Sequence, residues 1–270
     1  MDRQPIVAGQ FYSDSPEKLK SDLEILIGKV PAEKGPADKL IMVPHAGYVF
    51  SGRACGQVIA QSSLGQTVIL LGPNHTGAGD PLSVWPADEK WLFPGGSLEI
   101  DEDIASALVE SGSGFSFDRA AHLREHSLEV VLPFLHHMKP DIKIVPVCVS
   151  ENNIENLHTA GDALAEVVAN SSVPVTILVS SDMSHYISAE EAKMKDSMAL
   201  EKIVRIDPAG LYSIVQSNDI SMCGVLPMTM ALFAARSAGA LNGRLISYTN
   251  SGNVTGDNSQ VVAYAGVIIS

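Results

Sequence analysis

The segment TVILLGPNH, residues 67–75, carries the clearest indication of the fold, because a run of apolar, β-branched residues stops at Gly-Pro and is followed by a histidine. A short continuous apolar run of this kind is typical of a strand buried on both faces. Three further runs have the same character, at 39–43, 142–149 and 174–181. Strands buried on both faces belong to sheets covered by helices, so the sequence predicts an α/β protein.

Helical patterns alternate with these runs. Apolar residues at spacings of three and four predict helices over 51–62, 101–111, 125–138, 151–169, 189–204, 208–217 and 225–238. Residues 81–100, with two Trp and repeated Pro, favour a hairpin, and 243–251 and 259–269 predict two final strands. With no internal repeat or Pro/Ser-rich linker in the chain, we expect a single domain over 1–270, with a mainly parallel or mixed central sheet flanked by helices.

Composition narrows the classes of function. The 18 Lys and Arg are outnumbered by 31 Asp and Glu, for a net charge of −13, which argues against nucleic-acid partners and anionic membrane surfaces. The N-terminal segment lacks the apolar core of a secretory signal, and no apolar run approaches the ~20 residues that span a bilayer. We therefore expect a cytoplasmic protein without a membrane partner. Its three cysteines have no paired spacing, which favours reduced thiols.

Titratable side chains follow three of the predicted strands at the point where each strand ends. His45 follows the first strand, His75 follows the second, and Asp182 and His185 follow the strand at 174–181. In open α/β sheets, ligands bind in the crevice outside the carboxyl ends of the strands. If these strands are neighbours, their terminal side chains converge on one site.

Cys223 precedes the predicted helix that starts near Val225. A thiol at a helix N-terminus lies near the positive end of the helix dipole, which favours the thiolate, the form that binds metal or attacks an electrophile. Cys55 lies within a predicted helix and Cys148 within a predicted strand, so both are interpreted as small buried hydrophobic residues. Cys223 is the candidate functional thiol.

Glu125 and His126 form an acid and imidazole pair at the first turn of the helix predicted over 125–138. Two interpretations of Glu125 stay open: a site role, or an acid that complements the helix dipole. The role of His126 stays open with it.

Five motifs carry a resemblance to a known family: VPHAGYVFSGRACGQV, LGPNH, EHSLEVVLPFL, SSDMSHY and MCGVLPM. In this order they resemble the Memo family, also called AmmeMemoRadiSam system protein B, and the likeness extends from PIVAGQFY to YAGVII. The resemblance implies a fold like that of class III extradiol dioxygenases. It also implies a metal site formed by His45, His75 and Cys223, with His185 and Asp182 in the pocket.

The implied ligand set differs from that of non-heme Fe(II) oxygenases, which use two His and one carboxylate. Two imidazoles and a thiolate suit iron and copper, and zinc also fits them. We therefore expect iron or copper as the cofactor, with zinc as a further candidate.

The leading hypothesis is a metal-dependent, dioxygenase-like redox enzyme in which His185 acts as general acid/base and Asp182 orients it or supports a neighbouring group. The alternative is a non-catalytic scaffold that holds a peptide or a metal ion in the same pocket, and the third is a zinc-dependent hydrolase. The expected ligand is a small molecule or peptide. The family name also suggests a pathway shared with radical-SAM and AMMECR1-like proteins.

Overall fold

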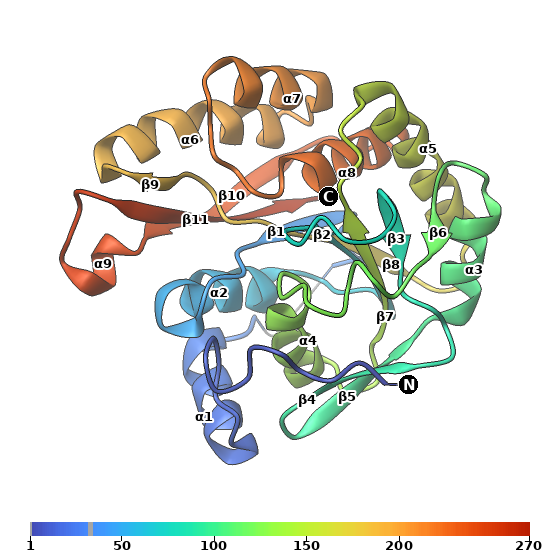
Figure 1. Cartoon of the computed structure of the whole chain (residues 1–270), viewed down its shortest axis with the longest axis horizontal. Helices are drawn as coiled ribbons and strands as arrows, with labels where there is room; N and C mark the ends of the chain where they lie inside the picture. Colours follow the sequence, from blue (N-terminus) through green and yellow to red (C-terminus); the bar gives the residue numbers. More distant parts are fainter. Residues whose placement is uncertain (1, 32–34) are drawn as a thin grey trace.

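The computed structural model describes residues 2–31 and 35–270, and within them the strands form one mixed sheet. Four parallel strands make its centre, and their side chains are almost all buried. In spatial order they are β1 (Leu40–Val43), β8 (Val175–Ser180), β2 (Thr67–Pro73) and β7 (Lys143–Val149). The predicted buried strands are therefore confirmed (Figure 1).

Antiparallel strands extend the sheet on both sides. Next to β1 lies β11 (Val261–Ile269), followed by β10 (Gly243–Asn250), both in antiparallel pairing. Beyond β7 lie β3 (Leu82–Val84), which is antiparallel to it, and β6 (Ser116–Phe117). The predicted hairpin is also present: β4 (Lys90–Phe93) pairs with β5 (Gly96–Ile100), and β5 runs parallel to β7. A short β9 (His185–Ile187) pairs with β11.

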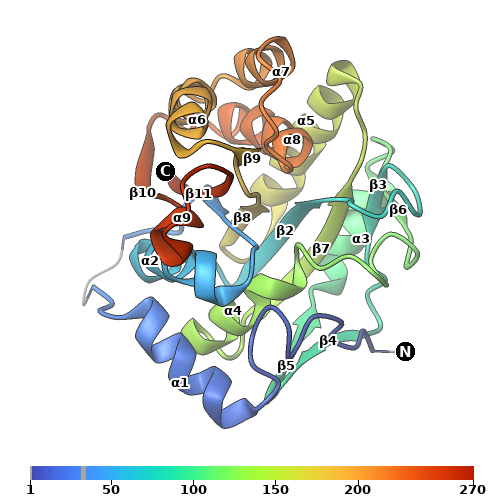
Figure 2. The same ribbon diagram turned by 60° about the vertical axis from the view of Figure 1, so that its left-hand side comes forward.

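Helices cover both faces of the sheet, as Figures 1 and 2 show. On one face lie α1 (Pro16–Ile27), α2 (Arg53–Gln61) and α4 (Leu132–Met138). On the other lie α3 (Glu102–Glu110), α5 (Ile154–Asn170), α6 (Ala189–Val204), α7 (Pro208–Ser217) and α8 (Val225–Ser237). A short α9 (Gly252–Thr255) joins β10 to β11. Among the described residues, none of these helices combines the length and hydropathy needed to cross a bilayer.

One predicted helix starts later than expected. The sequence predicts a helix from residue 125, but a 3₁₀ turn begins at Glu129 and α4 begins at Leu132, with Pro133 in its first turn. The carboxylate of Glu125 accepts hydrogen bonds from the backbone N–H groups of His126 and Ser127, which holds this segment in a turn. The segment His122–Ser127 is therefore a loop, and Glu125 is not a helix-start residue.

Candidate metal centre

The carboxyl ends of β1 and β2, with β8 between them, bring the predicted side chains together. His45 follows β1 and His75 follows β2, and their ring centroids lie 5.4 Å apart, edge to face. Asp182, after β8, accepts a hydrogen bond from the backbone N–H of His45 at 2.9 Å. Because these three strands are neighbours in the sheet, side chains far apart in the sequence meet at one edge.

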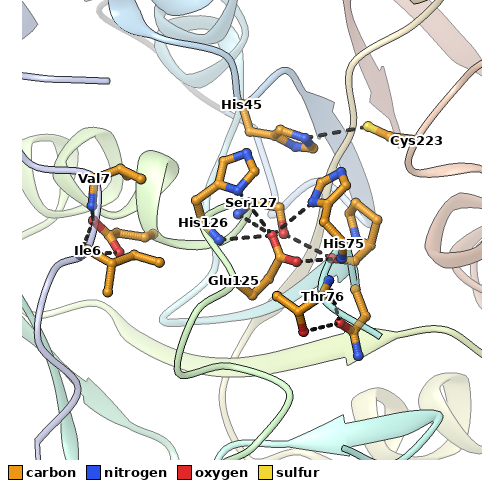
Figure 3. A network of polar contacts seen from close by, with 12 residues as sticks. Ile6, Val7, His45, His75, Thr76, Glu125, His126, Ser127 and Cys223 are labelled. Atoms are coloured by element: carbon orange, nitrogen blue, oxygen red, sulfur yellow. Dashed lines mark hydrogen bonds and ion pairs between the residues drawn. The ribbon is translucent and has the colours of Figure 1, made fainter. Parts of the chain in front are cut away.

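A third imidazole joins the two histidines. His126, from the loop before α4, has its ring centroid 5.6 Å from that of His45 and 5.1 Å from that of His75. Among the described residues, one nitrogen from each of these three rings falls into a cluster whose members all lie within 4.8 Å of one another. Figure 3 shows the three rings converging, with Cys223 beside the ring of His45. The sequence left the role of His126 open, and only the EH pair in the motif EHSLEVV pointed to it.

Glu125 holds this cluster together. Its carboxylate accepts hydrogen bonds from the backbone N–H of His75 at 2.6 Å and from Nδ1 of His75 at 2.9 Å, besides those from His126 and Ser127. Burial would raise the pKa of Glu125, but the hydrogen bond and charge of His75 and the backbone N–H groups hold that pKa at about 2. An ionised carboxylate can only accept, so Nδ1 of His75 carries a proton, and in the neutral imidazole Nε2 keeps the lone pair that can bind a metal. The hydrogen bond to Glu125 raises the pKa of His75, so a metal at Nε2 would displace a proton from this ring.

Ser180 orients His45 in the same way. Its hydroxyl donates to the carbonyl oxygen of Ser127 at 2.6 Å and lies 2.7 Å from Nδ1 of His45. Since the single hydroxyl proton is used, Nδ1 of His45 must donate to Ser180, and Nε2 carries the lone pair. Burial, followed by the charges of His126 and His75, lowers the pKa of His45 well below its ordinary value. His45 is therefore a neutral imidazole, the form that binds metal.

Cys223 lies just before α8, as the sequence predicted. Its Sγ is 3.4 Å from Nε2 of His45 and accepts the backbone N–H of Asp182 at 3.2 Å. The expected thiolate is wrong for the metal-free protein, because burial, together with the charge of Asp182, raises the pKa of Cys223. The desolvation of the sulfur raises the pKa of Cys223 by more than the dipole at the start of α8 lowers it. Cys55 and Cys148 are both buried.

Asp182 and His185 have different partners. Burial raises the pKa of Asp182 to about 6, and its carboxylate binds the backbone of His45. His185 is oriented by Ser221: its backbone N–H donates to the Ser221 hydroxyl at 2.7 Å, and its Nδ1 lies 2.9 Å from the Ser221 carbonyl oxygen. A carbonyl can only accept, so Nδ1 carries the proton and Nε2 is free to accept one. No sequence pattern indicated a role for Ser180, although it opens the motif SSDMSHY, or for Ser221, which directly precedes MCGVLPM.

Comparison with known proteins places this chain in a family. The family model described as "Memo-like protein" matches residues 3–268. The chain belongs to the Memo family. A MEMO1 family protein of Aquifex aeolicus is 41% identical, with 98% of each chain covered, and one of Methanopyrus kandleri is 38% identical, with 99% of each covered. The Memo resemblance noted in the sequence is therefore confirmed over nearly the whole chain.

A solved structure shares the fold of this Memo-family chain. An uncharacterized protein of Escherichia coli K12 superposes with a TM-score of 0.54, covering 84% of this chain and 99% of its own. At 14% identity, the likeness concerns the fold alone. The chemistry of the Memo site must therefore follow from its own side chains.

Proposed function

We propose that this Memo-family protein is a metal-dependent redox protein of the oxidoreductase type, whose metal is held by His45, His75 and Cys223. The observation that carries the proposal is the paired orientation of the two imidazoles. Ser180 and Glu125 each engage an Nδ1 atom, so that both histidines keep Nε2 for a cation. Partners that fix the tautomer in this way are the usual support of metal-binding histidines.

The donor set fits a transition metal. Imidazole nitrogens and a thiolate suit iron, copper and zinc, whereas magnesium and calcium require oxygen ligands. A bound cation would favour the thiolate of Cys223 by its own charge, because coordinating thiols are deprotonated outright. The backbone N–H of Asp182 already points at this sulfur and would stabilise its negative charge. Among the described residues, the cluster within 4.8 Å joins His126 to His45 and His75, and Cys223 approaches it at Nε2 of His45.

When bound, iron or copper would supply one-electron chemistry to a substrate held beside His45 and His75. His185 would accept a proton from the substrate at Nε2, while Ser221 keeps its Nδ1 proton in place. Asp182 would hold the backbone of His45, and so the ring, in a fixed position. The ring of Phe11, whose centroid lies 5.0 Å from that of His126, would give a small organic or peptide ligand an apolar contact beside the cluster.

A zinc-dependent hydrolase is the second candidate, because the cluster within 4.8 Å consists of three imidazoles. Three histidines with an open fourth position form a common catalytic zinc set. In that case His126 would be the third ligand and Cys223 a neighbour.

Metal analysis of protein purified without oxygen, followed by oxygen-uptake assays with catechol-like compounds, tests the proposal. Iron or copper in near-equimolar amount, with substrate-dependent uptake, is the expected result. Zinc without uptake would favour the hydrolase. A site that stays empty when iron, copper and zinc are supplied would favour the alternative that the protein is a non-catalytic, peptide-binding scaffold.

A further inference from the structure

Arg3 is buried near the N-terminus, with 2% of its surface exposed. Its backbone N–H donates to Lys90 and its carbonyl accepts from Leu92, so this residue lies along β4. The guanidinium stacks on Trp91, with Cζ 4.2 Å from the ring centroid. Backbone pairing and stacking together fix where the planar donor fork points.

The guanidinium points at the loop that carries Glu125. Nε donates to the carbonyl oxygen of His122 at 3.1 Å, and Nη2 donates to the carbonyl oxygen of Glu125 at 2.5 Å. Nη1 donates to the carboxylate of Glu129 at 2.8 Å. One side chain therefore holds both ends of the segment His122–Glu125 and also the acid that follows it.

Glu129 ties the same loop to the N-terminal segment a second time. Its carboxylate accepts the backbone N–H groups of Ile6 and Val7, and also the hydroxyl of Tyr12 at 2.7 Å. Figure 3 shows Ile6 and Val7 lying to one side of the three imidazoles, beyond His126. The N-terminal segment and the loop at 122–129 thus form one hydrogen-bonded unit.

We propose that Arg3 is a positioning residue of the metal centre. By holding the carbonyl oxygens of His122 and Glu125, it fixes the backbone from which the Glu125 carboxylate reaches His75 and from which His126 enters the cluster. The inference rests on the proposed metal site and adds to it a residue that touches none of the proposed ligands.

The test is the zinc affinity of Arg3→Lys, measured by competition with a chelator at a temperature where circular dichroism shows every variant folded. Lysine keeps the charge opposite Glu129 but offers a compact ammonium in place of a fork that spans three acceptors. We expect the dissociation constant for Zn²⁺ to rise about tenfold, the low end of the range for groups that support ligands. The visible spectrum of the Co²⁺-loaded variant should shift as well.

Two control variants separate positioning from general stability. Glu129→Gln removes the buried ion pair but leaves both carbonyl contacts of Arg3, so its midpoint of thermal unfolding should fall while its zinc affinity stays within twofold of the wild type. Arg119→Lys alters a different ion pair, with Glu89, and should change neither the unfolding midpoint nor the zinc affinity.

Equal zinc affinity in Arg3→Lys and the wild type would overturn the inference while leaving the metal centre intact. So would a loss of affinity in Glu129→Gln that follows its loss of stability. Absence of zinc, cobalt and iron binding by the wild-type protein would instead reject the metal centre itself, and the role of Arg3 with it.

Discussion

The hydroxyl of Ser180 lies 2.7 Å from Nδ1 of His45 and gives its only proton to the carbonyl oxygen of Ser127. This pair of hydrogen bonds forces the proton of His45 onto Nδ1 and leaves Nε2 facing Cys223. The tautomer of His45, a proposed metal ligand, is thus fixed by a serine on β8, a strand next to the one that carries the histidine.

Ser180→Ala should weaken metal binding by about 10- to 100-fold, because His45 loses the acceptor that selects its tautomer. Chelator competition with Zn²⁺ or Co²⁺ measures the change. Thr176→Val is the matched control: this buried hydroxyl on the same strand accepts the N–H of Gly65, far from the site. If both variants lose affinity equally, Ser180 acts through stability alone.

Cys223→Ser should weaken metal binding strongly, because a hydroxyl is a far poorer soft ligand than a thiolate. The Cu²⁺-loaded protein should also lose the sulfur-to-copper absorption band. Cys55→Ser serves as control, since Cys55 is a second buried thiol, within α2, and is not one of the proposed ligands. Unchanged stoichiometry and affinity in Cys223→Ser would remove this residue from the ligand set.

His126→Ala separates the two candidate ligand sets. With His45, His75 and Cys223 as ligands, the variant should keep near-equimolar metal, with an affinity lowered about tenfold or less by the loss of a neighbouring group. With three imidazoles as ligands, it should lose zinc as completely as His45→Ala does. Metal content after dialysis, determined for both variants side by side, decides between the oxidoreductase and hydrolase proposals.

His185→Ala should retain its metal, since its Nδ1 is bound to Ser221 and the residue is proposed to move protons. Turnover should fall by ~10²–10⁴-fold once a substrate is identified, the range usual for a positioned proton-transfer group. Ser221→Ala keeps the carbonyl oxygen that accepts from Nδ1 but removes the hydroxyl, so its turnover should fall by less than that of His185→Ala. Metal loss in His185→Ala equal to that in His45→Ala would make His185 a ligand instead.

The buried ring of His122 makes folding stability depend on pH. Burial, together with the charge of Arg3, lowers the pKa of His122 to about 4. The unfolded chain, with a histidine pKa of about 6.5, binds this proton first, so stability should be full above pH 6.5 and should fall as pH drops towards 4. The loss attributable to His122 amounts to about 3 kcal/mol.

Denaturant unfolding at several pH values checks this dependence. His122→Gln should flatten the slope between pH 6.5 and 4, whereas His158→Gln, which removes a half-exposed ring on α5, should leave it unchanged. An unaltered slope in His122→Gln would assign the acid sensitivity to other groups.

The sequence predicted the parts of the site that local pattern determines. Buried β-branched runs marked the strands, so the amino-acid order alone placed His45, His75 and Asp182 at strand ends. Cys223 could be placed at a helix start for the same reason. Each of these placements depends only on where one element begins or ends.

Contacts between distant segments decided the rest. The helix expected from residue 125 starts late because Glu125 bonds to His75, a residue 50 positions away, and this long-range contact puts His126 in the cluster. No local pattern predicts the hydrogen bonds of Ser180 and Ser221, because their roles depend on which imidazole rings lie against them. No sequence pattern indicated a role for Arg3, because the carbonyl oxygens that accept its hydrogen bonds lie some 120 residues further along the chain.

Cys223 and His45, whose side chains touch at 3.4 Å, are separated by 178 positions of the chain. During synthesis, the thiol leaves the ribosome long after both strand-end histidines, and β11, which pairs with β1, follows later still. Contacts of such high sequence separation form late in folding. In the proposed site, the imidazoles of a nascent chain are therefore exposed before the sulfur, and the complete donor set of His45, His75 and Cys223 forms only after Cys223 has emerged.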